Sequence, residues 1–174
     1  MGSAHTSVPR WPTSDPGLDR TGRSYAILSF GPDARPTAEG WHRQVVELGR
    51  PVWARHGGSA DEVLAELAER VEAARVGWRL MLAGPQADVL AARAVATSGG
   101  LLDAEITLLV TDDRHRRVWC SHCDTTTLAE VATGDVTGCS GCGRSLLVHH
   151  HVSRRNAAYL GFMVDAETID GEAV

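Results

Sequence analysis

Four cysteines in two pairs are the residues of this chain whose spacing most clearly indicates chemistry. Two residues separate Cys120 from Cys123, two separate Cys139 from Cys142, and the chain has no other cysteine. This spacing lets a tight turn present both thiolates of a pair to one ion, and two such turns complete a tetrahedron. The protein would fill all four positions, so the pattern predicts a structural site, and Zn²⁺ is the ion that it favours.

Two other fates of the thiols are compatible with the same spacing. An Fe(Cys)₄ centre uses the same ligands and would make the chain a small electron-transfer protein. Disulfides would need an oxidising compartment, but residues 1–23 lack the apolar core of a signal peptide. No stretch approaches the roughly 20 apolar residues of a membrane span, so we expect a cytoplasmic protein without membrane contact.

Composition limits the partners that the chain can have. Of its 174 residues, 43% are hydrophobic and 22% are charged, as in ordinary globular proteins. The net charge is −5, and all 17 basic residues are Arg. This balance argues against nucleic acid as the main partner, although a ribbon that binds nucleic acid or protein remains an alternative function.

Residues 24–113 alternate between apolar runs and amphipathic segments, a pattern typical of a parallel sheet covered by helices. Ser59 with Glu62 three residues later predicts a capping box at the start of the second helix. A small, doubly wound α/β domain is therefore the predicted fold class. The expected strands are 25–30, 51–56, 77–83 and 105–111, and the expected helices are 37–48, 60–75 and 86–97.

The remaining segments differ from this domain in composition. We expect a flexible arm at 1–23, a Cys₄ zinc ribbon at 114–164 and an acidic tail at 165–174. Inside the ribbon, 124–138 would form a strand pair with its loop, and 146–151 the final strand. The apolar segment 159–164 must then bury against the α/β domain or another subunit.

Candidate sites outside the cysteines are weaker. Gly84 and Pro85 end the third expected strand, where ligands bind in such domains, but without a G-x-G-x-x-G they predict at most a weak cofactor site. No G-x-S-x-G, H-E-x-x-H or S-x-x-K motif is present, so we expect no catalytic residue. On a strand, alternate members of the histidine run would face opposite sides. The residues expected at a partner interface are His149, His150, His151, Arg154, Arg155 and Tyr159.

Three segments of the ribbon resemble the C-terminal module of the DmmA-like family, the small A subunit of bacterial dimethylamine monooxygenases. The residues that carry the resemblance are Trp119 to Cys123, Cys139 to Arg155 and Ala158 to Asp165. Two further segments, Asp61 to Leu67 and Arg79 to Pro85, resemble the nucleotide domain of ferredoxin-reductase-type flavoenzymes. The departures from that pattern are Ala83 where those enzymes usually have Cys, and the lack of an upstream flavin-binding barrel.

The family resemblance implies a subunit of an NAD(P)H- and O₂-dependent monooxygenase that converts dimethylamine to methylamine and formaldehyde. The implied partners are a reductase subunit and a haem-type oxygenase subunit. NAD(P)H, flavin, iron–sulfur and haem groups would lie on those partners, because this chain lacks the residues for them. The implied role is that of a non-catalytic, zinc-binding accessory subunit.

Overall fold

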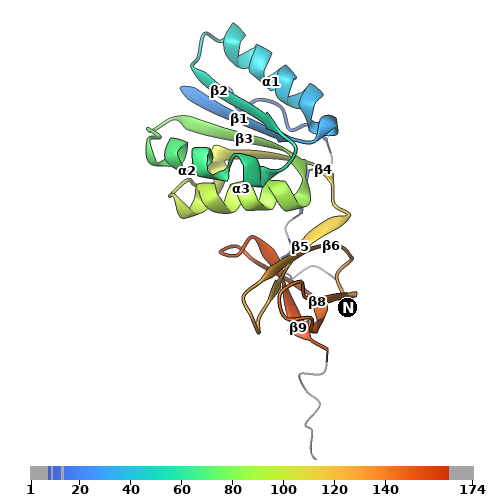
Figure 1. The fold of residues 1–174 in the computed structure, drawn as a ribbon. Coiled ribbons are helices and arrows are strands. Elements are labelled where there is room, and N and C mark those ends of the chain that lie inside the picture. Colours follow the sequence, from blue (N-terminus) through green and yellow to red (C-terminus); the bar gives the residue numbers. More distant parts are fainter. Residues whose placement is uncertain (1–7, 9, 13, 165–174) are drawn as a thin grey trace, which may run out of the picture. The chain divides into compact units, whose positions relative to one another are not determined.

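The computed structural model describes residues 8, 10–12 and 14–164. These residues fold into two compact units, an α/β domain at 10–113 and a β-rich unit at 114–164, which we call the ribbon. Figure 1 shows the sheet and helices of the first and the strands of the second. The tail expected at 165–174 and most of 1–9 lie outside the described residues.

A four-stranded parallel sheet is the centre of the α/β domain. Its strands are β1 (Ser24–Phe30), β2 (Val52–Gly57), β3 (Trp78–Pro85) and β4 (Ile106–Asp112), in the order β2-β1-β3-β4. The helices are α1 (Arg35–Glu47), α2 (Leu64–Glu72) and α3 (Gln86–Ser98), with short 3₁₀ turns at Pro32–Ala34, Ala60–Glu62 and Asp103–Glu105. The expected parallel α/β sheet is confirmed.

Both faces of this sheet are covered because successive side chains of each strand point to opposite sides. On one face, Tyr25 and Ile27 of β1 pack with Trp41 and Val45 of α1. On the other face, alternate residues of β1 pack with α2 and α3. The buried members of that second cluster include Ala26, Leu28, Phe30, Leu67, Val71, Val89 and Ala92.

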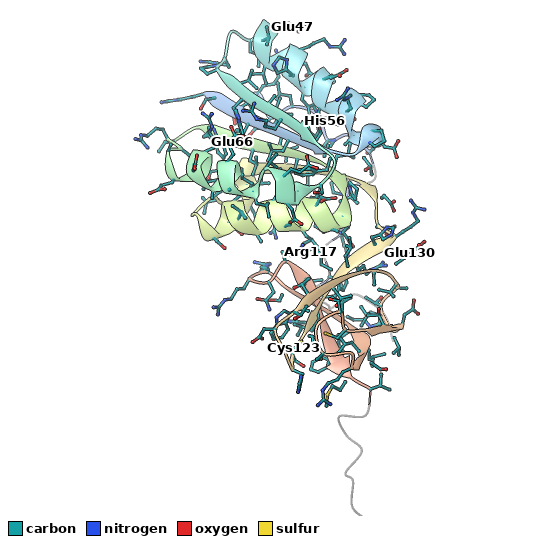
Figure 2. The ribbon with its side chains drawn as sticks, viewed as in Figure 1. Glu47, His56, Glu66, Arg117, Cys123 and Glu130 are labelled. Atoms are coloured by element: carbon teal, nitrogen blue, oxygen red, sulfur yellow. The ribbon has the colours of Figure 1, made fainter. Side chains whose placement is uncertain are left out.

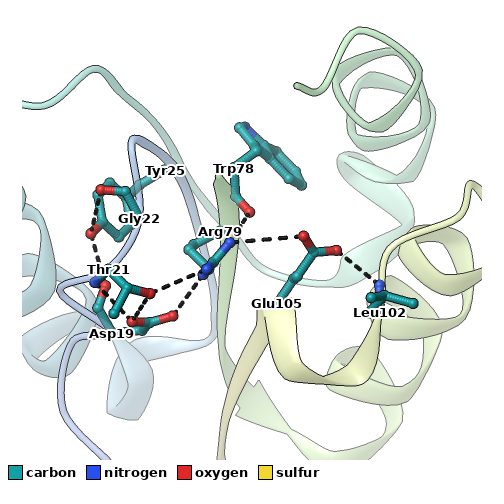
Figure 3. A network of polar contacts seen from close by, with 8 residues as sticks. All are labelled: Asp19, Thr21, Gly22, Tyr25, Trp78, Arg79, Leu102 and Glu105. Carbon is teal, nitrogen blue, oxygen red and sulfur yellow. Dashed lines mark hydrogen bonds and ion pairs between the residues drawn. The ribbon is translucent and has the colours of Figure 1, made fainter. Parts of the chain in front are cut away.

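Part of the segment expected to be a flexible arm is fixed to the α/β domain. Trp41 Nε1 donates a hydrogen bond to Asp15 Oδ1 at 2.9 Å. Arg79 Nε donates to Asp19 Oδ2 at 2.6 Å, and Tyr25 Oη donates to the Asp19 carbonyl at 2.7 Å (Figure 3). The bonds from Trp41 and Arg79 could not be predicted from the sequence, because these residues lie 26 and 60 residues away from their aspartate partners.

The predicted capping box at Ser59 is wrong. Ser59 makes no side-chain capping bond, and residues 60–62 form a separate 3₁₀ turn before α2 begins at Leu64. The backbone N–H of Ala60 instead donates to Asp88 Oδ1 of α3 at 2.7 Å. The side chain of Asp88 therefore satisfies one of the N–H groups at the start of this turn, in place of a local side-chain cap.

The ribbon is a five-stranded sheet of mixed direction. Its strands are β5 (His115–Cys120), β6 (Thr126–Glu130), β7 (Val136–Gly138), β8 (Ser145–Ser153) and β9 (Ala158–Met163), in the order β6-β5-β9-β8-β7. The apolar segment expected at 159–164 is β9, the central strand of this sheet. It pairs parallel to β5 and antiparallel to β8, so backbone bonds within the ribbon hold it.

The register of β8 shifts at the histidine run. Val148 lies opposite Gly161 and Val152 opposite Tyr159, so His149, His150 and His151 face a single residue of β9. All three histidines are exposed. The expected alternation of their side chains between two faces is wrong, because a bulge interrupts the two-residue period.

Among the helices of the described residues, none has the length and apolar character needed to cross a bilayer.

Candidate metal centre

The two cysteine pairs lie in turns that share one backbone design. Cys120 ends β5, and Cys139 follows β7 directly. In each turn, the residue after the second cysteine donates its N–H to the carbonyl of the first: Asp124 to Cys120 at 3.0 Å, and Gly143 to Cys139 at 2.9 Å. Both residues have positive φ, 58° for Asp124 and 72° for Gly143.

A second bond closes each turn in the same way. Cys120 N–H donates to the carbonyl of Thr125, and Cys139 N–H donates to that of Arg144, both at 2.9 Å. Sequence reasoning missed the roles of Asp124 and Thr125. A usable signal was present, because Asp and Gly are residue types that tolerate the left-handed conformation, and each directly follows a Cys-x-x-Cys.

The turns bring the four sulfurs together. All four Sγ atoms lie within 4.8 Å of one another. The Sγ atoms of Cys120 and Cys142 are 3.8 Å apart, and those of Cys123 and Cys139 are 3.5 Å apart. A metal–sulfur bond of about 2.3 Å in a tetrahedron requires sulfurs separated by about 3.8 Å. The four cysteines therefore fit one tetrahedral ion, and no disulfide joins them.

Packing between the turns keeps this spacing. A methyl group at Gly141 would lie 2.4 Å from Thr125 Oγ1 and 3.2 Å from Cys123 Sγ, so only glycine leaves room for the opposite turn. Ser140 also contacts Thr127 of β6: its N–H donates to Thr127 Oγ1 at 3.0 Å, and the two hydroxyl groups are 3.1 Å apart. These contacts hold the two pairs face to face (Figure 2 marks Cys123).

The protein environment makes the thiols unequal in acidity. The backbone N–H groups of Cys142 and Gly141 donate to the sulfur of Cys139 and lower its pKa to about 6. Hydrogen bonds from the hydroxyl and backbone N–H of Thr125 lower the pKa of Cys123. The N–H of Arg144 acts to lower the pKa of Cys142, but burial and the neighbouring sulfurs outweigh it and raise that pKa to about 11. A bound cation would favour the thiolate form of all four.

The other residues singled out from the sequence lie apart from the cysteines. Arg154 and Arg155 are exposed in the turn between β8 and β9, but Tyr159 is 1% exposed and belongs to the core of the ribbon. Gly84 has a packing role in the α/β domain, since a methyl group there would lie 2.8 Å from Phe30 Cβ. Pro85 directly precedes α3 as its N-cap residue.

These observations define a class of protein, in which a parallel α/β domain is joined to a β-ribbon that carries a four-cysteine metal site. Residues 117–162 match the family model described as the C-terminal domain of "Dimethylamine monooxygenase subunit DmmA-like". The resemblance of the chain to the DmmA-like family is therefore confirmed, and the matched segment contains all four cysteines.

A curated relative and a solved structure are also similar to this chain. The first is the "Heme-dependent oxidative N-demethylase delta subunit" of Ectopseudomonas mendocina (strain ymp), 42% identical over 101 residues. That match covers 58% of this chain and 57% of the relative, so the chain spans little more than half of that protein's length. The second is phthalate dioxygenase reductase, at 15% identity and a TM-score of 0.43, over 69% of this chain and 46% of the reductase. This structural similarity is too weak to support an inference.

Proposed function

We propose that the chain is a non-catalytic, zinc-binding accessory subunit of a multicomponent monooxygenase that oxidatively N-demethylates dimethylamine. The observation that carries this proposal is the match of the four-cysteine segment to the DmmA-like C-terminal domain. The 42% identity to a subunit of a heme-dependent oxidative N-demethylase supports the same reaction class. In this proposal the protein works in the cytoplasm, and the reaction consumes NAD(P)H and O₂ and yields methylamine and formaldehyde.

Zinc is the metal that we propose for the ribbon. Four cysteines fill every position of a tetrahedral ion, which is the arrangement of structural zinc and leaves no open position for water or substrate. A [2Fe–2S] cluster would divide the thiolates between two irons, whereas here all four sulfurs lie within 4.8 Å of one another. A single iron fits the same geometry, so a small electron-transfer protein with an Fe(Cys)₄ centre is the second candidate function.

The exposed groups of the ribbon supply the proposed contact surface for the partner subunits. His149, His150, His151, Arg154 and Arg155 are all exposed. Arginine is suited to such surfaces because its planar guanidinium pairs bidentately with carboxylates. Tyr159 is left out of this surface because its side chain is buried.

An apolar row lies beside His149. Val136, Leu147 and Phe162 are opposite one another on β7, β8 and β9, and all three are exposed. The ring of His149 meets that of Phe162 edge-on, with centroids 5.4 Å apart. Exposed aromatic and arginine side chains are enriched in protein interfaces. We propose that this face meets the reductase and haem-type oxygenase subunits, which would hold the flavin, iron–sulfur and haem groups.

Native purification tests the proposal. The chain should be isolated gently from its own cells, and the proteins recovered with it should be identified by mass spectrometry. Stoichiometric recovery of a flavin/iron–sulfur reductase and a haem protein is the expected result. Recovery of the chain alone would overturn the proposal. Recovery with nucleic acid would also overturn it, and would favour a ribbon that binds nucleic acid.

Two further measurements make the test specific. Arg154→Ala with Arg155→Ala should weaken assembly with the partners, whereas Arg20→Ala with Arg50→Ala, two exposed arginines of the α/β domain, should not. Elemental analysis of the purified chain should give about one zinc per chain. A red protein that contains one iron per chain would replace the accessory role with electron transfer.

A further inference from the structure

A cavity of about 560 Å³ lies in the α/β domain, apart from the residues of the metal centre. It lies between α1 and the carboxyl ends of β1 and β2. Ile27 and Ser29 of β1 and Ala54 and His56 of β2 line it, at alternate positions of each strand. In open parallel sheets, ligands bind outside the carboxyl ends of the strands where the strand order reverses, which in this sheet is between β1 and β3. The cavity lies one strand away from that point, at β1 and β2.

One face of α1 forms the opposite wall. The lining residues of the helix are Arg35, Ala38, Glu39, His42 and Arg43, and their spacing of three and four places them on the same side. Trp41 and Val45 of the same helix are fully buried against the sheet and hold it in place. The cavity therefore has an apolar floor of small and aliphatic side chains and a wall of ionisable ones.

A hydrogen-bonded pair at the strand ends, one member buried and one exposed, orients a polar group toward this space. Ser29 is 2% exposed, and its Oγ lies 2.8 Å from Nδ1 of His56. His56 itself is exposed (Figure 2), so its second ring nitrogen, Nε2, remains for another partner. No carboxylate of the described residues contacts this imidazole, so the pair lacks the acid that orients the histidine of a hydrolytic triad. Its chemistry suits binding rather than nucleophilic attack.

The charges of the lining favour an anion. Three arginines line the cavity. Arg55 donates two hydrogen bonds to Glu66 of α2, at 3.0 and 2.9 Å. Arg35 and Arg43 make no ion pair or side-chain hydrogen bond with any described residue. Glu39 is the one acid that lines the cavity. Two guanidinium groups that make no ion pair with a described residue, against the one carboxylate of Glu39, give a local positive charge in a chain whose net charge is −5.

We propose that this cavity binds a small organic anion, a single phosphate ester or carboxylate on an apolar body. Arg35 and Arg43 pair with the anionic group, because guanidinium groups form charge-assisted bonds with phosphate and carboxylate oxygens. His56 Nε2 adds a hydrogen bond, and the apolar body packs on Ile27 and Ala54. The volume is within the range of small-molecule sites, roughly 300–1,000 Å³. This inference does not depend on the proposed oxygenase role.

Titration of the full, zinc-loaded chain with phenyl phosphate and with benzoate tests the site, followed by ¹H–¹⁵N NMR. We expect saturable shifts confined to the amides of residues 35–43 and 54–57. Phenol, the matched uncharged ring, should bind at least about tenfold more weakly, which is a difference of about 1.4 kcal/mol. Tighter binding of phenyl phosphate than of benzoate would identify phosphate esters as the class, and the reverse order would identify carboxylates.

Variants show whether the binding uses this cavity. Arg43→Gln and Arg35→Gln should each weaken phenyl phosphate at least about fivefold. Arg50→Gln, just beyond the end of α1 and outside the lining, should change nothing. A thermal melt and the zinc content confirm that each variant is folded. Absence of saturable shifts up to about 10 mM, equal binding of phenol, or unchanged affinity in both arginine variants would overturn the proposal.

Discussion

The α/β domain and the ribbon obtain their stability in different ways. The domain buries large side chains in two clusters on either side of its sheet, among them Trp41, Phe30 and Leu67. In the ribbon, the buried apolar residues are few: Val118, Leu146, Val148, Val152, Ala157, Ala158 and Tyr159, together with two of the cysteines. A module with so small a core usually needs a metal or disulfides to fold. From this comparison we expect a bound metal to matter to the stability of the ribbon and not to that of the α/β domain.

Loss of one metal ligand is the change expected to produce the largest difference in stability between the two units. Cys139→Ser leaves three thiolates, so the ribbon should lose its metal and unfold while the α/β domain keeps its helices. The metal content measured by elemental analysis should fall from about one ion per chain to nearly none. Limited proteolysis should then remove the ribbon but leave residues 10–113.

Ser121→Ala is the matched control, since Ser121 lies in the first turn but its side chain makes only a 3.4 Å hydrogen bond to the Gly161 carbonyl. It should retain the metal. Unchanged metal content and protease resistance in Cys139→Ser would contradict both the four-thiolate site and the dependence of the ribbon on it.

The converse change removes core volume from the α/β domain. Leu82 on β3 is fully buried, and Leu82→Ala should destabilise the domain by about 3 kcal/mol through the lost burial and the cavity left behind. Denaturant unfolding followed by circular dichroism at the helix band measures this loss, and the metal content should not change. Leu102→Ala, at a residue that is 66% exposed, should have almost no effect. Metal release in Leu82→Ala would show that the two units do not unfold independently.

The cysteine spacing and the alternation of 24–113 could be interpreted from the sequence because both are local. Two residues between thiols define a turn, and Gly and Pro mark the ends of buried strands. The bulge at His149–His151, the turn at 60–62 and the fixed segment around Asp19 could not be predicted in this way. The turn at 60–62 and the segment around Asp19 depend on partners far along the chain, the carboxylate of Asp88 and the guanidinium of Arg79. The bulge depends on the register of β8 with the next strand, β9, which the residue types of the histidine run do not determine.

The same limit hid Ser29 and His56. They are 27 residues apart, and parallel pairing of β1 with β2 brings them opposite each other. The available signal was a polar residue near the end of each of two strands. These two residues can be recognised as a pair only when the strand order is known.

Within the ribbon, the smallest residue of the central strand should be sensitive to enlargement. A methyl group at Gly161 would lie 2.8 Å from Val118 Cγ1 and 3.0 Å from Leu146 Cδ1. Gly161→Ala should therefore destabilise the ribbon by about 1–3 kcal/mol, the usual cost of overpacking. Faster transfer of the metal to a competing chelator measures the effect. Gly138→Ala is the control, because the new methyl group meets nothing within 4 Å, and this variant should transfer its metal at the wild-type rate. Equal transfer rates in the two variants would contradict the packing argument.

The smallest expected effect concerns the ion pair that fixes the N-terminal segment to the α/β domain. A hydrogen bond from the Thr21 hydroxyl, with help from the backbone N–H of Thr21 and from Arg79, lowers the pKa of Asp19 below its ordinary value of 3.8. A carboxyl group with a lowered folded-state pKa contributes stability that is present above its unfolded pKa and is lost as the pH falls through the folded value. Asp19→Asn should therefore cost about 0.5–1 kcal/mol at pH 6, after allowance for screening by solvent.

The difference between wild type and Asp19→Asn should shrink as the pH falls below about 4, because the wild-type carboxyl then becomes protonated as well. Denaturant unfolding of both proteins at pH 6 and pH 3 measures it. Asp33→Asn is the control, since Asp33 is exposed and makes no ion pair with a described residue, and it should follow the wild type at both values. A difference between wild type and Asp19→Asn that stays constant from pH 6 to pH 3 would mean that Asp19 acts through neutral hydrogen bonds alone, and that its charge does not hold the segment to β3.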